Sequence, residues 1–390
     1  MHRSVLQVMH FVLSMGQAEE KVLRALCVSG WQRWPSIGLQ TWRFMYCRIT
    51  AEFSFLLKVM QLLLRQFLAK VSHIPVPCRR MGATGMTPGK LASYWEKVFY
   101  QHGIPEPEDS SQILIAHALG AKTMHSIGSC AAWSPVSTDQ LLLVEKMAQE
   151  RLKRVPVQYI IGEWDFLDMT LEMRPPVLIP RPETEELVGL VVAVCEELHC
   201  STEASVLEVG CGSGAVSLAL LRMIPQVCVI AIDKSEAAVS LTRDNAVRLG
   251  LQHRLHLLQH DILTDPIERL LDLGAVSAVV SNPPYICTED MSQLEPEILS
   301  LYHVPRYEDH SALHGGLDGM DVMKGILRLA PLLLKDGGDV FLEGDPRHPE
   351  MVKKWLEDHP EGRLQLQNIV KDFCGKPRFI HLRRRQSSER

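Results

Sequence analysis

Several features that would place this 390-residue chain in a special class are missing from it. Its ten cysteines include no C-x-x-C pair, which removes the usual signatures of a zinc ribbon or a redox disulfide, and we expect them to be reduced. The longest apolar stretch, Phe53 to Ala69, is shorter than a bilayer requires and contains Lys58 and Arg65, which predicts no transmembrane helix. With 46 % hydrophobic residues, the chain can still fill the cores of two soluble globular domains.

Basic residues are scarce outside the N-terminal region. Residues 1–90 carry twelve Lys and Arg against three acidic residues, whereas the rest of the chain carries 29 Lys and Arg against 43 acidic residues. Proteins that hold duplex DNA or structured RNA through many phosphates need a broad basic surface, which this acidic body lacks. We therefore expect a protein or small-molecule substrate and no direct contact with nucleic acid.

The first 88 residues form a basic extension with amphipathic apolar runs, such as Phe53 to Arg65. Basic, amphipathic segments poor in acidic residues are typical of organelle transit peptides, and this composition predicts import into the mitochondrial matrix. Met81 and Met86 lie just ahead of the next domain. Initiation at either methionine would give a cytoplasmic protein without the extension, and the sequence leaves both readings open.

The pattern of apolar residues changes twice along the rest of the chain. It has helical spacing up to about Lys153, then reads as two strands, 157–166 and 169–173, joined by a turn, and from Glu183 strands and helices alternate. Such alternation predicts an α/β fold with a doubly wound, mostly parallel sheet, which binds ligands at the carboxyl ends of its strands. The expected units are the basic extension (1–88), a helical domain (89–153), a β-hairpin linker (154–182), the α/β domain (183–385) and a short tail (386–390).

A glycine-rich loop, Glu208-Val-Gly-Cys-Gly-Ser-Gly-Ala215, lies where the first strand of the α/β domain meets a helix. Glycines there let the backbone approach a ligand closely. The loop also fits the G-x-G-x-x-A fingerprint of nicotinamide enzymes, with Asp233 at the end of the second strand, so a dehydrogenase is one reading. Glu208 favours another reading, a class I methyltransferase, in which an acidic residue at this position lies near the amino acid portion of the methyl donor.

The tetrapeptide Asn282-Pro-Pro-Tyr285 follows an apolar fourth strand, at the same edge of the sheet as the glycine loop. An amide nitrogen is a poor nucleophile because its lone pair is delocalised, so a catalyst has to hold the NH2 group with acceptors that favour a pyramidal nitrogen. The Asn282 side chain and the Pro283 carbonyl supply acceptors, two prolines stiffen them, and the Tyr285 ring provides a flat wall. The tetrapeptide therefore predicts methylation of a planar amide or amine nitrogen by S-adenosylmethionine, with no general base.

Three further side chains follow strand ends and are candidates for holding the donor. Asp233 is expected to accept hydrogen bonds from the ribose hydroxyls. Asp261 and Ile262, at the end of the third strand, are expected at the adenine, although Asp261 suits a helix N-cap nearly as well. The three histidines between residues 253 and 260 would be split between the two faces of a strand, so we predict no metal site.

With both motifs in place, the chain resembles the HemK/PrmC family of N(5)-glutamine methyltransferases, in particular its mitochondrial branch. The resemblance covers about Lys90 to Arg385 and includes five more segments. It implies a class I S-adenosylmethionine-dependent methyltransferase domain joined by a β-hairpin to a small N-terminal helical domain. The five segments are Pro156-Val-Gln-Tyr-Ile-Ile-Gly-Glu-Trp-Asp-Phe166, Ile179-Pro-Arg-Pro-Glu-Thr-Glu-Glu-Leu-Val188, Tyr307-Glu-Asp309, Gly315-Gly-Leu-Asp-Gly-Met-Asp321 and Asp372-Phe-Cys-Gly-Lys-Pro-Arg-Phe379.

The resemblance implies methylation of the glutamine in the Gly-Gly-Gln motif of class I peptide-chain release factors, here mitochondrial ones. The helical domain would dock the release factor, and the loop with Arg181 and Thr184 would close over the site. We expect a monomer that uses S-adenosylmethionine and no metal. The implied donor-binding residues are Glu208, Gly210, Cys211, Gly212, Ser213, Gly214, Asp233, Asp261, Ile262 and Asn282, and the implied catalytic or glutamine-binding residues are Asn282, Pro283, Pro284, Tyr285, Arg181 and Thr184.

The sequence departs from the family at residues 301–306, which resemble an insertion in a loop beside the substrate, and at Ile262, where the family can carry an aromatic residue. Two rival functions also follow from the motifs. A methyltransferase for an exocyclic amine of DNA or RNA would use the same tetrapeptide, and the acidic body argues against it. A non-catalytic protein that binds release factors or the ribosome would keep the fold, but it would not need an intact Asn282 and glycine loop.

Overall fold

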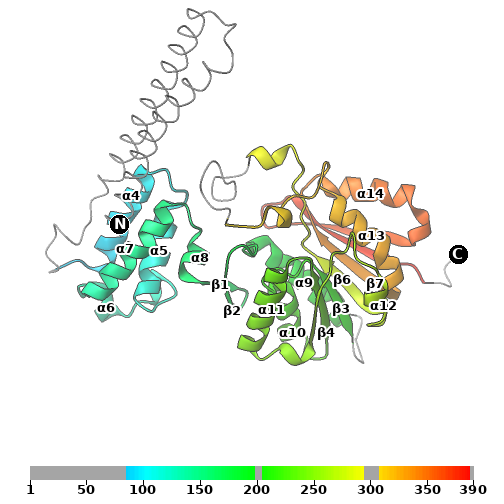
Figure 1. The fold of residues 1–390 in the computed structure, drawn as a ribbon, viewed down its shortest axis with the longest axis horizontal. Coiled ribbons are helices and arrows are strands. Elements are labelled where there is room, and N and C mark those ends of the chain that lie inside the picture. Colours follow the sequence, from blue (N-terminus) through cyan, green and yellow to red (C-terminus); the bar gives the residue numbers. More distant parts are fainter. Residues whose placement is uncertain (1–84, 198–203, 294–306, 387–390) are drawn as a thin grey trace, which may run out of the picture. The chain divides into compact units, whose positions relative to one another are not determined.

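The computed structural model describes residues 85–197, 204–293 and 307–386 (Figure 1). The segment 301–306 lies outside these ranges, as do all but the last four residues of the extension 1–88 and all but the first residue of the tail 386–390. No helix within the described ranges is long and apolar enough to span a membrane.

The first folded part of the chain is a group of helices. They are α4 (Pro88–Gln101), α5 (Pro107–Ala118), the 3-10 turn η1 (Met124–Ser126), α6 (Ser129–Trp133) and α7 (Thr138–Leu152). Leu91, Trp95 and Phe99 recur every fourth residue on one face of α4 and are buried in the shared core. A capping box, in which Ser137 and Gln140 bond each other reciprocally, starts α7.

The predicted strand 157–166 is wrong in its first half. Val157–Ile161 forms the short helix α8, which Gly162 ends with a φ of +77°. Only Glu163–Phe166 is a strand (β1), paired antiparallel with β2 (Met169–Glu172). A five-residue apolar run is too short for its periodicity to separate helix from strand, so tertiary packing decides. Here the run packs into the core of the helical group.

A seven-stranded sheet forms the centre of the second folded part (Figure 1). Its strands are β3 (Ser205–Val209), β4 (Cys228–Asp233), β5 (Leu255–Gln259), β6 (Val276–Ser281), β7 (Leu334–Glu343), β8 (Leu364–Lys371) and β9 (Pro377–Arg384). The order is β5-β4-β3-β6-β7-β9-β8, in which β5 to β7 are parallel neighbours and β9 lies antiparallel between β7 and β8. Chain order reverses between β3 and β6, so their carboxyl ends define the crevice where such sheets bind ligands.

Helices cover both faces of the sheet. They are α9 (Pro182–Glu197), α10 (Ala215–Met223) and α11 (Glu236–Leu249) on one face, and α12 (Glu268–Leu271), α13 (Asp321–Leu333) and α14 (His348–Asp358) on the other; short 3-10 turns, η2 (Gln252–Arg254), η3 (Asp290–Gln293), η4 (His310–Ala312) and η5 (Pro360–Gly362), lie in the connections. Because successive side chains of a strand point to opposite faces, Val206 of β3 is buried in the core beneath α9 and α10, and Leu207 is buried in the core beneath α13 and α14. This architecture confirms the predicted α/β fold with a doubly wound, mostly parallel sheet.

Candidate active site

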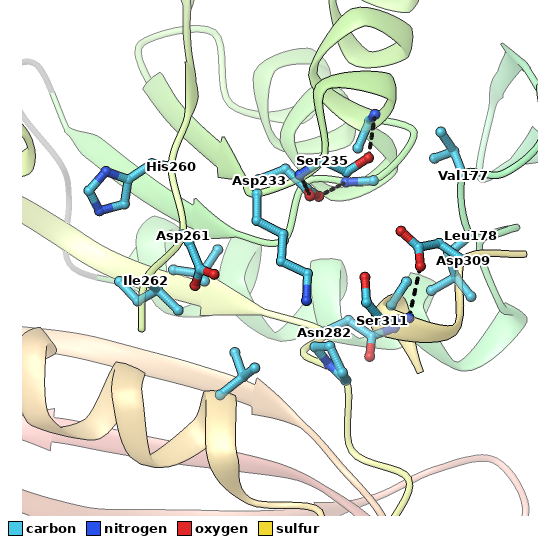
Figure 2. A pocket seen from close by; sticks show the side chains of 18 of the residues that line it. Val177, Leu178, Asp233, Ser235, His260, Asp261, Ile262, Asn282, Asp309 and Ser311 are labelled. Atoms are coloured by element: carbon cyan, nitrogen blue, oxygen red, sulfur yellow. Dashed lines mark hydrogen bonds between the residues drawn. The ribbon is translucent and has the colours of Figure 1, made fainter. Parts of the chain in front are cut away.

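A first pocket opens at the carboxyl ends of the parallel strands, where this topology places ligands. Its empty volume is about 760 Å³, counting the solvent at its mouth. Figure 2 shows Asp233, Asp261 and Asn282, each from the end of a different strand, around this pocket. Of the residues that the sequence assigns to a site, those that line it are Gly210, Gly212, Asp233, Asp261, Ile262, Asn282 and Pro284.

The glycine loop turns sharply after β3. Gly210, Gly212 and Gly214 have φ values of +80°, +55° and +84°, which L side chains rarely adopt. A Cβ at Gly212 would meet open space, and one at Gly210 would meet only the Asn282 carbonyl oxygen at 3.9 Å, so both positions leave room for a ligand. A Cβ at Gly214 would instead lie 2.9 Å from the Cγ2 atom of Thr242. The third glycine therefore packs the loop against α11.

Asp233, at the end of β4, is held by backbone amides. Its Oδ2 accepts from the Gly212 N–H at 3.0 Å, and its Oδ1 accepts from the Ser235 N–H at 2.9 Å (Figure 2). Burial nevertheless raises the pKa of this carboxyl above its ordinary value. Since a carboxylate oxygen has two lone pairs, each oxygen can accept a further hydrogen bond from neighbouring hydroxyl groups of a ligand.

Glu208 lies behind the glycine loop and is not among the residues that line the first pocket. It is 2 % exposed, and its Oε2 accepts from both the backbone N–H and the hydroxyl of Ser217 in α10. Burial raises the pKa of the Glu208 carboxyl to about 8. Cys211 and Ser213 are also buried and are hydrogen-bonded to α11. The Glu208 carboxyl, the Cys211 thiol and the Ser213 carbonyl oxygen therefore shape the loop from behind.

Asp261 and Ile262 follow β5 and line the first pocket. The Asp261 Oδ1 accepts from the Leu263 N–H at 2.9 Å, so this carboxylate closes a turn as well as lining the pocket. Ile262 is buried in a hydrophobic core against which Val322 of α13 also packs, and both residues line the pocket. The end of β5 thus combines a hydrogen-bond acceptor with an aliphatic surface.

A second pocket shares Leu178, Asn282 and Ala312 with the first, and Asn282 is the polar side chain among the three. Its empty volume is about 510 Å³, again counting open solvent. Its walls are mostly apolar, with one guanidinium among them. The lining residues are Leu178, Arg181, Asn282, Pro283, Tyr285, Ile286, Ala312 and Leu313. Asn282 therefore lies where a ligand in one pocket would meet a ligand in the other.

A buried chain of hydrogen bonds orients the side chain of Asn282. Its Nδ2 donates to the Thr184 hydroxyl oxygen at 3.0 Å, and the Thr184 hydroxyl donates to Glu343 Oε2 at 2.9 Å. Thr184, in the first turn of α9, is 3 % exposed and lines neither pocket. Because the amide nitrogen is used in this chain, the Oδ1 atom of Asn282 is the one that can accept a hydrogen bond from a ligand.

Tyr285 forms part of the wall of the second pocket. Its hydroxyl donates to Glu343 Oε1 at 3.5 Å, the long limit for such a bond. Its ring meets the ring of His348 edge-on, with the centroids 6.3 Å apart. Burial, and then the nearby Glu343 carboxyl, raise the pKa of the Tyr285 phenol above its ordinary value, which keeps this wall uncharged.

Arg181 joins two segments that are distant in the sequence. Its Nη2 donates to both oxygens of Glu308, at 3.1 and 2.9 Å, and the Ile179 N–H donates to Glu308 Oε1 at 3.0 Å. Glu308 is buried, and the next residue, Asp309, lines the first pocket together with Leu178 (Figure 2). The segment that carries Arg181 is therefore fastened to the segment that carries Glu308, and both supply walls.

Three acidic residues of this site, Glu343, Glu308 and Asp309, were not among the site residues predicted from the sequence. Glu343 ends β7 as Asp233 ends β4, so the position of an acid at a strand end was the available signal. Glu308 and Asp309 belong to the motif Tyr307–Asp309, which the resemblance marked without a role. In the described parts of the chain, no three His, Cys, Asp or Glu side chains lie close enough together to hold a metal ion.

Comparison with known proteins finds two matching families, the PrmC N-terminal domain over residues 90–162 and the methyltransferase small domain over residues 192–298. The MTRF1L release factor glutamine methyltransferase of Homo sapiens is 50 % identical over 299 residues, which is 76 % of this chain and 87 % of that protein. The release factor glutamine methyltransferase of Mycolicibacterium smegmatis is 35 % identical over 279 residues, 71 % of this chain and 91 % of that protein. A solved release-factor-specific protein-(glutamine-N5) methyltransferase from Alicyclobacillus acidocaldarius is 25 % identical, with a TM-score of 0.33, over 55 % of this chain and 99 % of that one.

Proposed function

Because the chain belongs to the release factor glutamine methyltransferases, we propose that it methylates the side-chain amide nitrogen of the glutamine in the Gly-Gly-Gln motif of a class I peptide-chain release factor. The methyl donor is S-adenosylmethionine. The observation that carries the proposal is Asn282, which belongs to both pockets while its amide nitrogen is bound to Thr184. Membership of this family removes the dehydrogenase reading of the glycine loop.

The first pocket has the features that S-adenosylmethionine requires. Asp233 offers two fixed acceptors for the ribose hydroxyls. Asp261 and Ile262 offer an acceptor and an aliphatic surface for the adenine. The open backbone at Gly210 and Gly212 leaves room for the amino acid portion. Once bound there, the donor supplies a methyl group on a positively charged sulfur.

The remaining donor-binding residues act through the shape of the glycine loop. Cys211 and Ser213 face α11, and Gly214 permits close packing there. Glu208 holds the start of α10 against the loop through Ser217. We propose that these four residues set the shape of the loop, because they do not line the pocket. Fewer residues than the sequence implies would then contact the donor directly.

The second pocket takes the glutamine side chain. Its amide NH2 group donates to the Asn282 Oδ1 and to the Pro283 carbonyl, and two acceptors on one nitrogen favour the pyramidal geometry in which the lone pair points at the methyl group. Pro284 stiffens this array, and the Tyr285 ring packs over the amide. No base is assigned, because the proton can leave after methyl transfer. Arg181, held by Glu308, forms another part of the wall.

The protein partner and the location follow from the same assignment. We place docking of the release factor on the helical domain (89–153), joined to the α/β domain (183–385) through the linker 154–182, and expect the enzyme to act as a monomer. The human relative is named MTRF1L release factor glutamine methyltransferase, and the basic extension of this chain has the composition of a transit peptide. Together they favour a location in the mitochondrial matrix.

Incubation with labelled S-adenosylmethionine and candidate release factors, followed by peptide mass mapping, tests the proposal. One added methyl group on the glutamine of the Gly-Gly-Gln peptide is the expected result. A release factor in which that glutamine is replaced serves as the control. Label on DNA or RNA instead, or donor binding without any transfer, would support the rival functions.

A further inference from the structure

We infer that Glu343 is a positioning residue for methyl transfer, because its carboxylate decides which atom of the Asn282 amide is presented to the acceptor. This inference rests on the proposed function, since it takes Asn282 Oδ1 as the acceptor for the substrate NH2. Glu343 is 1 % exposed and lines neither pocket. It can therefore act only through the side chains that it binds, Thr184 and Tyr285.

The direction of each hydrogen bond follows from counting protons. A carboxylate has no proton, so the Thr184 hydroxyl has to be the donor in its 2.9 Å bond to Glu343 Oε2. That hydroxyl has one proton, which is then used. The Thr184 oxygen can therefore only accept from Asn282, 3.0 Å away, and the Asn282 amide turns its NH2 toward Thr184. Its Oδ1 is consequently left for the substrate.

Charged and titratable groups from three other elements surround Glu343. α9 contributes Glu183, and the segment after β6 contributes Tyr285. β9 contributes Arg378, whose Nε is bound to Asp372 at 2.8 Å. Hydrogen bonding and Arg378 favour the carboxylate, but burial is the largest influence and raises the pKa of Glu343 to about 7. The Asp372–Phe379 motif thus acquires a role, since its arginine helps to keep Glu343 charged.

Protonation of Glu343 would reverse the chain of hydrogen bonds. A carboxylic acid can donate to the Thr184 oxygen, which leaves the Thr184 proton for Asn282 Oδ1. The amide then turns over and presents its NH2, a donor, to the substrate NH2. As the pH falls through the pKa of Glu343, turnover should therefore fall, while donor binding at Asp233 on β4 should change little.

The kinetic test compares kcat and the donor KM of full-length variants on both sides of neutral pH, with a release factor as the acceptor. Glu343→Gln copies the shape of the protonated acid, and we expect kcat to fall about ten-fold or more and the acid limb of the pH profile to disappear. Thr184→Val should lower kcat similarly, and Thr184→Ser should restore it. The matched control is Asp339→Asn, a buried carboxylate of the same strand bound to Arg383, which should keep the wild-type pH profile.

A second readout needs no turnover. The side-chain NH2 signals of Asn282 in NMR spectra, assigned by their loss in Asn282→Asp, should shift with pH in the wild type and stay constant in Glu343→Gln. Wild-type kcat and pH profile in Glu343→Gln, or Asn282 signals that ignore pH in the wild type, would overturn the inference. A wild-type enzyme inactive on every release factor would contradict the proposed function, and the NMR titration would still decide the role of Glu343.

Discussion

Asn282 is the polar side chain among the three residues that line both pockets, so its replacement separates chemistry from donor binding. In Asn282→Ala the acceptor for the substrate NH2 is lost, whereas Asp233 and the glycine loop remain. Loss of one oriented contact at a reacting centre costs roughly 10²-fold or more in rate, and we expect at least this loss of glutamine methylation. Donor affinity, measured by calorimetry, should stay within a few-fold. Near-normal turnover by the folded variant would contradict the placement of the active site.

Asp233 gives the opposite pattern. Asp233→Ala removes two acceptors for the ribose hydroxyls and two bonds that hold the backbone of Gly212 and Ser235. Since hydrogen bonds to charged groups are worth about 1.5–3 kcal/mol, donor affinity should fall roughly ten-fold or more without unfolding. Calorimetry measures the affinity and circular dichroism the fold, with the exposed Asp272→Ala as the control. Unchanged affinity in a folded Asp233→Ala protein would refute the assignment.

At the scale of elements, the segment Gly315–Asp321 braces the Asn-Pro-Pro-Tyr segment. A Cβ at Gly319 would lie 2.4 Å from the Tyr285 carbonyl oxygen, and a Cβ at Gly315 would lie 2.6 Å from the Pro284 carbonyl oxygen. Real Cβ atoms do not approach a backbone oxygen so closely. The glycines in this motif therefore have a physical reason, which is that one backbone has to touch another directly behind the tetrapeptide.

Alanine at Gly319 and at Gly274 separates this crowding from backbone strain. Both glycines have positive φ, +77° and +85°, so alanine costs about 1–2 kcal/mol at either position. A Cβ at Gly274 meets open space, whereas one at Gly319 meets backbone. We expect Gly319→Ala to melt at a lower temperature than Gly274→Ala and to lose more turnover than donor affinity. Equal melting temperatures and equal turnover in the two variants would argue against bracing.

Elements with a long apolar pattern were predictable from the sequence. Helix α11 (Glu236–Leu249) belongs to the predicted alternation of strands and helices after Glu183, because its 14 residues are enough to show a period of 3.6. The run Val157–Ile161 was misread because five apolar residues have no resolvable period. Strand order placed Asp233 and Asn282 at one edge of the sheet, as predicted. The contact between Thr184 and Glu343 was not predictable, since it joins residues 159 positions apart.

At the scale of the whole chain, charge is divided between a basic extension and an acidic body. We predict that residues 1–88 carry a fluorescent reporter into mitochondria, because of their eleven-to-three excess of basic over acidic residues. A protein that begins at Met86 should methylate release factors in vitro as fast as the full chain. A reporter that stays diffuse in the cytosol would favour Met81 or Met86 as the start, and slow turnover of the shortened protein would give the extension a part in the chemistry.

The pocket boundary at Asn282 also bears on the order of events. Because the two pockets share this residue, both ligands have to be present at once for the methyl group to pass directly between them, and initial-rate plots should intersect instead of running parallel as in ping-pong kinetics. It follows that one molecule could occupy both sites. An adenosine head linked through a short chain to a primary amide would bind more tightly than either half, since the second half binds at the high effective concentration set by the linker.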